Sequence, residues 1–431
     1  MKLKKWLLSG LTLLTGLSLA ACGNSSGGGG ESASSDGPVE IEYWYPNADT
    51  QGGQTVTELI NEFNESQDEV HVTGVFQSGM YQGLMQNLQT NAAAGQVPAL
   101  VQIGWSYREY FANNFEYSQP QEIIDNLSSE DSSFITDKFE ENIYSLATAN
   151  DDSQVGLPYS LSVPVIYLNM DILNEAGVNK DDLKTWEDIR EAAQTISEKT
   201  DHTGLYIQEA EDNWNIQSMV ESNGSQMLKD GKAAFADDKG KETYQFYQDM
   251  VEEGSAIHAS GEDGQQAFIS GNIGMWHQTI AQRTNVMNNA NFEAVAIPSP
   301  AFEGEEINKP AGGSMLVVTA QDDDQQLAAW KFMKFLYEPD NIAAWTKGTG
   351  YVPPTKDASD NEELQALIKD DKIFPAAYAN LENLVPWAPF PGNSGMQAEQ
   401  MLIDLKDRVL GGADVDTEVQ KTQDEINQLI K

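Results

Sequence analysis

The sequence predicts an α/β protein whose sheets are covered by helices. Two observations lead to this fold class. From residue 38 onward, short apolar segments alternate with segments of helical periodicity. One of the short segments, residues 98–103, is almost wholly apolar, as in a strand of a sheet that helices cover on both faces. Strand–helix–strand alternation of this kind favours an α/β architecture.

The first part of the chain supplies three strands and two helices. Alternation of apolar and polar residues predicts strands over residues 41–45 and 70–75, and the apolar run at 98–103 is the third strand. The spacing of apolar residues over 81–88 predicts one helix. Another helix is predicted between the first two strands, where apolar residues recur at i, i+3, i+4 and i+7: Val56, Leu59, Ile60 and Phe63.

A strand predicted over residues 156–170 starts a new unit. Further on, Thr185 is followed three residues later by Asp188, which is close to a capping box. A helix should therefore begin at Trp186, and we expect this indole to pack inside its own part of the molecule rather than face a ligand.

Further strands and helices are predicted in the last third of the chain. Residues 271–276 are predicted as a strand that leads into a helix near 279–288. Residues 314–319 are predicted as another strand, and the helix after it has a buried stripe at 329–336. Two C-terminal helices follow, with stripes formed by Met401, Leu402, Leu405 and Val409 and by Ile426, Leu429 and Ile430. No internal repeat is visible.

The N-terminal residues have the pattern of a bacterial export signal. Three lysines precede an apolar run at 6–19 that is too short and too asymmetrically flanked for a membrane span. The run ends in LAACG at 19–23, which resembles the lipobox of bacterial lipoproteins. We therefore expect a signal peptide over 1–21, lipidation of Cys22 and a flexible tether over 22–37. The alternative is an ordinary signal peptide with an incidental cysteine.

Charge and cysteine content exclude several classes of function. The chain has a formal charge of −42 and a single cysteine, so an intramolecular disulfide is impossible. Removal of residues 1–21, which carry three lysines and no acidic residue, leaves −45. So acidic a surface argues against binding to nucleic acid and against adhesion to anionic lipid. No later apolar stretch is long enough to span a bilayer, so the mature protein is predicted to be soluble apart from its anchor.

Seven short motifs follow one another along the chain. They are GMYQGL (79–84), GQVPA (95–99), LPY through PVIYLNMD (157–171), KTW (184–186), FISGNIGM (268–275), GGS (312–314) and TGYVP (349–353). The ordered set resembles the extracellular solute-binding proteins for sugars and glycerol-phosphate compounds, the maltose-binding-protein-like class. Within that class, the glycerol-3-phosphate-binding branch is the most similar. Each motif alone is weak, whereas the set, which spans roughly residues 40 to 410, is specific.

The resemblance implies a two-lobed periplasmic-binding-protein fold of type II, with three crossings between the lobes. On this pattern, lobe 1 comprises residues 38–149 and 308–350, and lobe 2 comprises 150–307 and 351–431. Ligand would bind in the cleft between the lobes, which would close by hinge motion. The implied partner is the permease of an ABC importer. We expect a monomer anchored at the outer face of the cytoplasmic membrane, with no cofactor and no resident metal ion.

Ligand-binding residues are predicted beyond the carboxyl ends of strands, where aromatic rings can stack on the apolar faces of sugars. Three of the candidate tryptophans follow or end predicted strands, one lies in a polar loop and one in a Pro-rich stretch. The candidates are Trp44, Tyr81, Trp105, Tyr159, Ser162, Trp214, Trp276, Gly313, Tyr351 and Trp387. The alternative for each tryptophan is core packing, which we expect for Trp330 and Trp345 because both lie on predicted helices.

The resemblance supports part of this set residue by residue. Tyr81 and Tyr351 match ligand-contacting tyrosines of the glycerol-phosphate binders. Ser162 matches the position of a ligand-contacting serine or its neighbour. Gly313 belongs to a glycine pair whose backbone can approach the ligand closely.

Two departures from the family pattern bear on the identity of the ligand. Trp105 stands where the family has an acidic residue that bonds glycerol hydroxyls, and Phe390 stands where it has a phosphate-binding arginine. A phosphodianion removed from water needs charge-assisted donors. The sequence therefore favours an uncharged mono- or oligosaccharide, and the negative net charge points the same way. Glycerol-3-phosphate or a glycerophosphodiester is the alternative, with Arg283 or Lys347 as the substitute cation.

Two rival functions are a secreted glycoside hydrolase and a polysaccharide adhesin. A glycosidase needs two carboxyl groups, but 67 Asp and Glu residues allow any pair to be nominated. The four histidines are not spaced as a metal-ligand cluster, and the motifs of serine hydrolases, zinc proteases and nucleotide enzymes are absent from the sequence. We therefore predict that the protein captures its ligand without catalysis.

Overall fold

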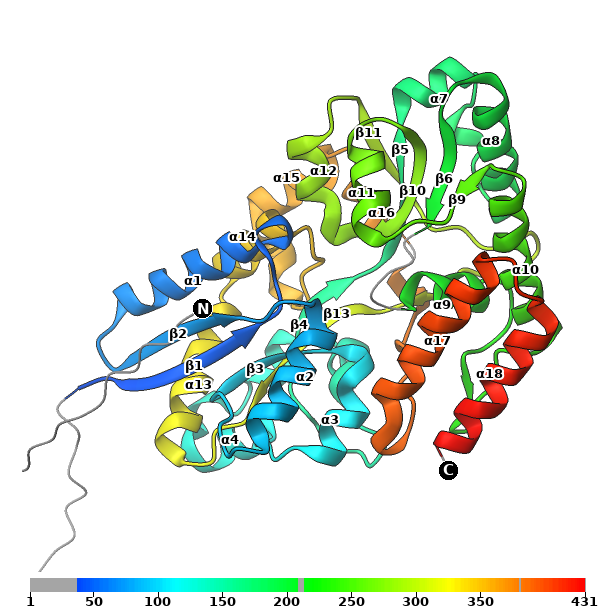
Figure 1. Ribbon diagram of the computed structural model, residues 1–431. Helices are drawn as coiled ribbons and strands as arrows, with labels where there is room; N and C mark the ends of the chain where they lie inside the picture. The colour runs from blue at the N-terminus through cyan, green and yellow to red at the C-terminus, as the bar shows by residue number, and fades with distance from the viewer. Residues whose placement is uncertain (1–36, 208–212, 380, 431) are drawn as a thin grey trace, which may run out of the picture. The chain divides into compact units, whose positions relative to one another are not determined.

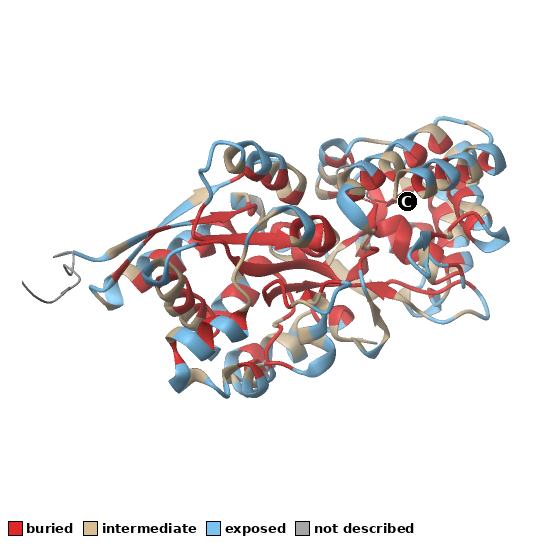
Figure 2. Cartoon of the chain, turned by 90° about the horizontal axis from the view of Figure 1, so that it is seen from below, coloured by how far each residue is buried: buried red, intermediate tan, exposed pale blue. Residues whose placement is uncertain are grey.

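The computed structural model describes residues 37–207, 213–379 and 381–430, and residues 38–431 form one compact unit. The predicted signal peptide, Cys22 and the tether up to residue 36 lie outside the described residues. The compact unit contains two five-stranded sheets with helices packed against them (Figure 1). Buried residues follow the sheets and the inward faces of the helices (Figure 2). The predicted α/β class is confirmed.

The first sheet has the strand order β2-β1-β3-β13-β4. Its strands are β1 (Val39–Tyr45), β2 (Val70–Phe76), β3 (Leu100–Gly104), β4 (Leu157–Ser162) and β13 (Gly312–Val318). β1 pairs in parallel with β2 and β3, while β13 runs antiparallel between β3 and β4. The three parallel strands therefore end at one edge of the sheet.

Amphipathic helices cover this sheet. They are α1 (Gly53–Ser66), α2 (Met80–Ala92), α3 (Arg108–Asn114), α4 (Pro120–Leu127), α5 (Phe134–Lys138), α6 (Glu141–Tyr144), α13 (Asp323–Leu336) and α14 (Pro339–Thr349). The predicted apolar stripe of α1 is buried against the strands, as is the stripe of α13. Trp330 and Trp345 are fully buried, as the sequence predicted.

The second sheet has the strand order β11-β5-β10-β6-β9. Its strands are β5 (Pro164–Asn169), β6 (Thr203–Ile207), β9 (Ala256–Ile257), β10 (Ile273–Thr279) and β11 (Ala294–Pro298). β5 is antiparallel to β10 and β11, whereas β6 is parallel to β9 and β10. A short hairpin, β7 (Leu228–Lys229) with β8 (Lys232–Ala233), stands apart from it.

Helix α8 (Trp186–Lys199) begins where the sequence predicted. The Thr185 hydroxyl accepts a hydrogen bond from Asp188 N (3.2 Å), and the Asp188 carboxylate accepts one from Thr185 N (2.9 Å), which completes a capping box. Trp186 is fully buried in the core of the second sheet.

The remaining helices surround the second sheet or connect the two parts. They are α7 (Met170–Ala176), α9 (Trp214–Glu221), α10 (Asp238–Glu252), α11 (Gly261–Ile269), α12 (Arg283–Asn289), α15 (Glu362–Asp370), α16 (Pro375–Tyr378), α17 (Gly395–Leu410) and α18 (Val415–Leu429). The C-terminal pair α17 and α18 shares a core with α8 and α10. No helix within the described ranges is long and apolar enough to cross a bilayer.

The chain passes between the two sheets at three places. The predicted single strand over 156–170 is in fact two strands, β4 and β5, which belong to different sheets and are separated only by Val163. Pro164, which has no N–H to donate, is the first residue of β5, a position at which a strand tolerates proline. The sequence placed this strand wholly in the second lobe, whereas β4 belongs to the first sheet. The exact lobe boundaries stay a prediction.

The other two crossings run beside the first. β12 (Lys309–Pro310) lies between β11 and β13 and pairs in parallel with β14 (Leu384–Val385). After α14, Val352 N donates to Leu161 O (2.7 Å), so this segment is tied to β4. Gly312, directly after the second crossing, is also paired with Ser162 at the end of β4. Both later crossings are thus held beside the first by backbone pairing.

Candidate functional site

A cavity of about 470 Å³ lies between the ends of the two sheets. On the side of the first sheet it is lined by residues that end or follow β1, β2 and β3, among them Gln51, Phe76 and Tyr107. On the side of the second sheet it is lined by α11 and the end of β10. The cavity therefore lies beyond the carboxyl ends of strands, where α/β sheets place their ligands.

Aromatic rings form part of the wall. Trp214 and Trp387 pack with their ring centroids 6.1 Å apart, at 42° to each other. The hydroxyls of Tyr81 and Tyr351 lie 3.4 Å apart. Behind Tyr351, the fully buried Trp345 stacks on its ring, with centroids 5.9 Å apart and planes at 11°. These rings offer apolar faces together with phenol and indole groups, which suits a ring-shaped polar ligand.

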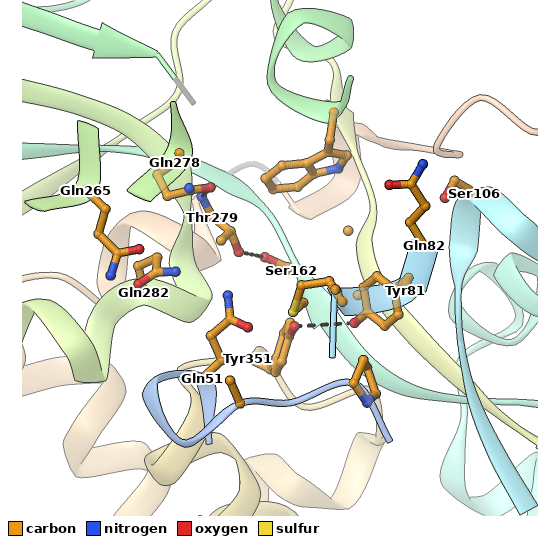
Figure 3. Close-up of a pocket in the computed structure, with 18 of the residues that line it drawn as sticks. Gln51, Tyr81, Gln82, Ser106, Ser162, Gln265, Gln278, Thr279, Gln282 and Tyr351 are labelled. Atoms are coloured by element: carbon orange, nitrogen blue, oxygen red, sulfur yellow. Dashed lines mark hydrogen bonds between the residues drawn. The ribbon is translucent and has the colours of Figure 1, made fainter. Parts of the chain in front are cut away.

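Glutamine side chains supply amides to the cavity wall, and three of them lie across from Tyr81. Six of them line the cavity: Gln51, Gln82, Gln265, Gln266, Gln278 and Gln282. Figure 3 shows Gln265, Gln278 and Gln282 on one side, with Tyr81 and Gln82 across from them. Each amide offers both donors and an acceptor, so this wall can bond hydroxyl groups in either sense.

Two hydroxyls connect the parts of the molecule at the base of the cavity. Ser162, at the end of β4, hydrogen-bonds with Thr279, at the end of β10. Gln278 accepts a hydrogen bond from Thr279 N (2.7 Å), so its side chain is fixed as well. A ligand in the cavity would meet side chains of both sheets at this point.

Two glycines let the backbone of β13 lie close to its neighbours, Trp214 and β4. A Cβ added at Gly312 would stand 2.7 Å from the ring of Trp214, closer than such contacts occur. Gly313 has φ +104°, and its Cβ would stand 2.1 Å from Ser160 O, so only glycine fits there. Gly312 O accepts a hydrogen bond from Trp105 Nε1 (3.0 Å), and Pro310 O accepts one from Trp214 Nε1 (2.9 Å).

The cavity wall is nearly free of charge. Among the described residues that line it, Glu262 is the only acidic residue, and none is lysine or arginine. The proposed substitute cations are engaged elsewhere: Arg283 pairs with the largely buried Asp371 (2.6 Å), and Lys347 pairs with Glu363 (2.6 Å). Phe390, which the resemblance predicts to stand where the family has an arginine, is buried in the core of the second sheet.

The structure brings together six of the ten residues predicted to contact ligand. Those that line the cavity are Tyr81, Ser162, Trp214, Gly313, Tyr351 and Trp387. They come from α2, β4, α9 and β13, from the segment after α14 and from the segment after β14. Residues separated by hundreds of positions in the chain thus meet at one cavity.

The structure does not place the other four in the lining of this cavity. Trp276 lies inside β10, three residues before its end, and packs on Tyr167 with centroids 5.6 Å apart. Tyr159 stacks on Trp345 in the core of the first sheet (4.7 Å). Trp105 donates its indole N–H to Gly312 O. Trp44 packs beside β3, and its Nε1 donates to the carboxylate of Glu42 (3.0 Å).

Sequence reasoning missed the amide wall. Gln265 and Gln266 lie on α11, which was not predicted, and Gln278 follows the predicted end of β10. Gln278 and Gln282 belong to a strand and to the turn after it, so no periodicity marked them as one face. Sequence reasoning also missed Phe76, at the end of β2. This phenylalanine lines the cavity and is 46% exposed.

Comparison with known proteins agrees with this arrangement. The family model for bacterial extracellular solute-binding proteins matches residues 58–376. An sn-glycerol-3-phosphate-binding periplasmic protein from Escherichia coli O1:K1 is 23% identical over 390 residues, and an arabinooligosaccharide-binding protein from Bacillus subtilis is 26% identical over 390 residues. Both alignments cover 86% of this chain and 86% of the relative.

A solved structure shows the same fold. The Mycobacterium tuberculosis relative in complex with glycerophosphocholine superposes with a TM-score of 0.80 and 20% sequence identity, covering 92% of this chain and 98% of that one. At 20% identity the likeness concerns the fold, and it shows that this chain has the two-lobed periplasmic-binding-protein fold.

Proposed function

This chain belongs to the bacterial extracellular solute-binding proteins, and we propose that it captures an uncharged mono- or oligosaccharide for an ABC importer. The observation that carries the proposal is the composition of the cavity wall. It combines stacking surfaces from Trp214 and Trp387 with the six glutamine amides described above. Aromatic faces and neutral amides are the groups that bind sugar rings and their hydroxyls.

The phosphate-containing alternative has less support from the same wall. A phosphodianion loses several kcal/mol of hydration on burial unless cations or many N–H groups replace the water. The described lining residues include neither lysine nor arginine, and Arg283 and Lys347 are already paired with carboxylates. An uncharged ligand needs no such compensation. Because one relative binds glycerol-3-phosphate, phosphate-containing ligands are included in the binding test below.

Capture without catalysis is also supported by the cavity. Hydrolysis of a glycosidic bond requires an acid and a second carboxylate at a defined separation of roughly 5–10 Å. Among the described lining residues, only Glu262 carries a carboxyl group. The relatives named above are binding proteins as well.

We further propose that acyl chains on Cys22 hold the protein at the outer face of the cytoplasmic membrane, where a permease receives the ligand. The support is the lipobox-like sequence at 19–23 and the Gly/Ser-rich stretch that follows it. Mass spectrometry of the N-terminal peptide should show a diacylglyceryl modification on Cys22. A membrane fraction that retains the Cys22→Ala variant as fully as the unsubstituted protein would argue against this anchor.

The ligand class can be tested by thermal shift and calorimetry on the purified protein. The panel should contain maltotriose, arabinotriose and tagatose, with glycerol-3-phosphate and glycerophosphocholine as the phosphate-containing set. A ligand that binds only the folded form raises the melting temperature. We expect at least one neutral saccharide to do so and to be recovered unchanged by chromatography. Stabilisation by the phosphate compounds alone would overturn the proposed ligand class.

A further inference from the structure

Helix α9 is attached at both ends to the crossing segment before β13. At its first residue, Trp214 lines the cavity and donates its indole N–H to Pro310 O (2.9 Å). Just past its last residue, Ser222 donates its hydroxyl to Asn308 O (3.0 Å). The helix is therefore a fixed support at the base of the cavity.

Trp387, the neighbour of Trp214 in the cavity wall, is held in a different way. Its side chain is buried, and within the described part of the chain its indole N–H has no hydrogen-bond partner. The ring therefore takes its orientation from packing on Trp214 and from the backbone of its own loop. The question is what fixes that backbone.

Gln217 of α9 bonds the loop on both sides of Trp387. Its Oε1 accepts a hydrogen bond from Ala388 N (3.1 Å), and its Nε2 donates one to Pro386 O (3.0 Å). Two bonds from one planar amide to the residues that flank Trp387 restrict how the loop can turn. Pro386 adds to this restriction because its φ is fixed by its ring.

Glu221 fixes the sense of the Gln217 amide. Glu221 Oε1 accepts from Gln217 Nε2 (3.3 Å) and from Met227 N (3.4 Å). Because Met227 N–H can only donate, this oxygen is an acceptor, and the NH₂ group of Gln217 must face it. That orientation leaves Gln217 Oε1 for the N–H of Ala388, so the two bonds to the loop can form together.

We infer that Gln217 is a positioning residue of the ligand site, which clamps residues 386–388 and thereby sets the wall that Trp387 presents to the ligand. The inference rests on the proposed function only in taking that ligand to be a saccharide. Through α9, both indoles of the wall are fixed to one rigid support, so their relative orientation is built before the ligand arrives. Such pre-organisation reduces the ordering cost of binding.

The first test needs no ligand. Acrylamide quenching of the Trp387 emission, obtained by subtracting the spectrum of a matched Trp387→Phe variant, should rise severalfold in Gln217→Leu, which has neither donor nor acceptor. The control is Gln248→Leu, because Gln248 is also buried and bonds two carbonyls, Val409 O (2.6 Å) and Ala413 O (2.8 Å), away from the cavity wall. This control should leave the quenching unchanged. Unchanged quenching in a folded Gln217→Leu protein would overturn the inference.

If Gln217→Leu does not fold, the near-isosteric Gln217→Glu carries the same test. It keeps an acceptor for Ala388 N but loses the donor to Pro386 O and places a second carboxyl group beside Glu221, so the quenching should again increase. Quenching equal to that of the unsubstituted protein would contradict the clamp.

The second test is a double-mutant cycle with maltotriose as the probe. Gln217→Leu should weaken the dissociation constant about tenfold when Trp387 is present and leave it unchanged in a Trp387→Ala background, because residues that act through each other are not additive. Equal weakening in both backgrounds would assign Gln217 a general structural role and overturn the inference. If the unsubstituted protein does not bind maltotriose, that result counts against this ligand, and the quenching experiment alone decides the clamp.

Discussion

Trp214 presents its ring to the cavity, whereas Trp44, of similar burial, does not line it. We predict that Trp214→Ala weakens binding of the cognate saccharide by about 1–3 kcal/mol, the contribution of one buried aromatic contact. Titration calorimetry measures this directly. Trp44→Ala is the control, since it should lower stability and leave the dissociation constant unchanged. Equal losses of affinity in the two variants would remove Trp214 from the ligand site.

His277 makes stability depend on pH. It is fully buried in β10, its Nε2 lies 3.0 Å from Ser299 Oγ, and burial lowers its pKa to about 3. The unfolded chain, with an ordinary histidine pKa, binds a proton between about pH 6.5 and pH 3 that the folded chain does not bind. Stability therefore rises with pH across this window and is lost as the pH falls through it.

The expected effect of His277 is up to about 5 kcal/mol between the ends of this window. Urea unfolding of the unsubstituted protein and of His277→Gln at pH 7 and pH 4.5 measures it, because the variant should lose less stability over that interval. His258→Gln is the control, since His258 is partly exposed beside Asp407 (3.1 Å). An identical pH dependence in the His277 variant and the parent would show that another group titrates.

Single residues also show where sequence reasoning reached its limit. The sequence correctly predicted that Trp330, Trp345 and Trp186 are buried, because each belongs to an amphipathic helix. It could not separate Trp214 from Trp105, since both were assigned only to a loop or a strand end. The direction of such a ring is set by a distant partner, here the carbonyls of Pro310 and Gly312.

At the scale of elements, strand β13 and helix α9 meet so closely that one position tolerates only glycine. A methyl group at Gly312 would stand 2.7 Å from the Trp214 ring. We predict that Gly312→Ala displaces this ring and costs about 1–3 kcal/mol, as overpacking does. The affinity for saccharide should fall as well, which calorimetry and urea unfolding together would show.

The control for this prediction is Gly395→Ala. A Cβ at Gly395 would have its nearest neighbour at 3.4 Å, which is an ordinary contact. That variant should keep both stability and affinity. If Gly312→Ala bound saccharide as tightly as the parent, Trp214 would not be constrained by β13 in the way described.

Elements with strong local signals were predicted well. The capping box at Thr185 and Asp188 and the stripe of α1 are local patterns, and both are present. The predicted strand over 156–170 failed because both of its halves are fully buried strands, and no charged or turn-forming run marks the change of sheet at Val163. Short helices such as α9 and α11 were missed for a related reason, since a few turns give little periodicity.

For the molecule as a whole, the three crossings suggest a hinge. Backbone bonds tie the crossing segments together, while side chains from the ends of both sheets line the cavity. If the lobes close on a ligand, small-angle scattering should show a smaller radius of gyration when a saccharide that raises the melting temperature is added. A non-binding sugar at the same concentration is the control. No compaction would favour a rigid adhesin over a component of an importer.

The sequence by itself determined the α/β class, the helices with clear stripes and the membership in the solute-binding family, because these depend on local periodicity and on motifs in a fixed order. The absence of a phosphate-binding arginine at Phe390 stays a prediction from the resemblance. Only the tertiary structure decided which aromatic side chains reach the cavity, which glutamines line it and how Gln217 holds Trp387. These features depend on contacts between segments far apart in the chain, and such contacts leave no periodic trace in the sequence.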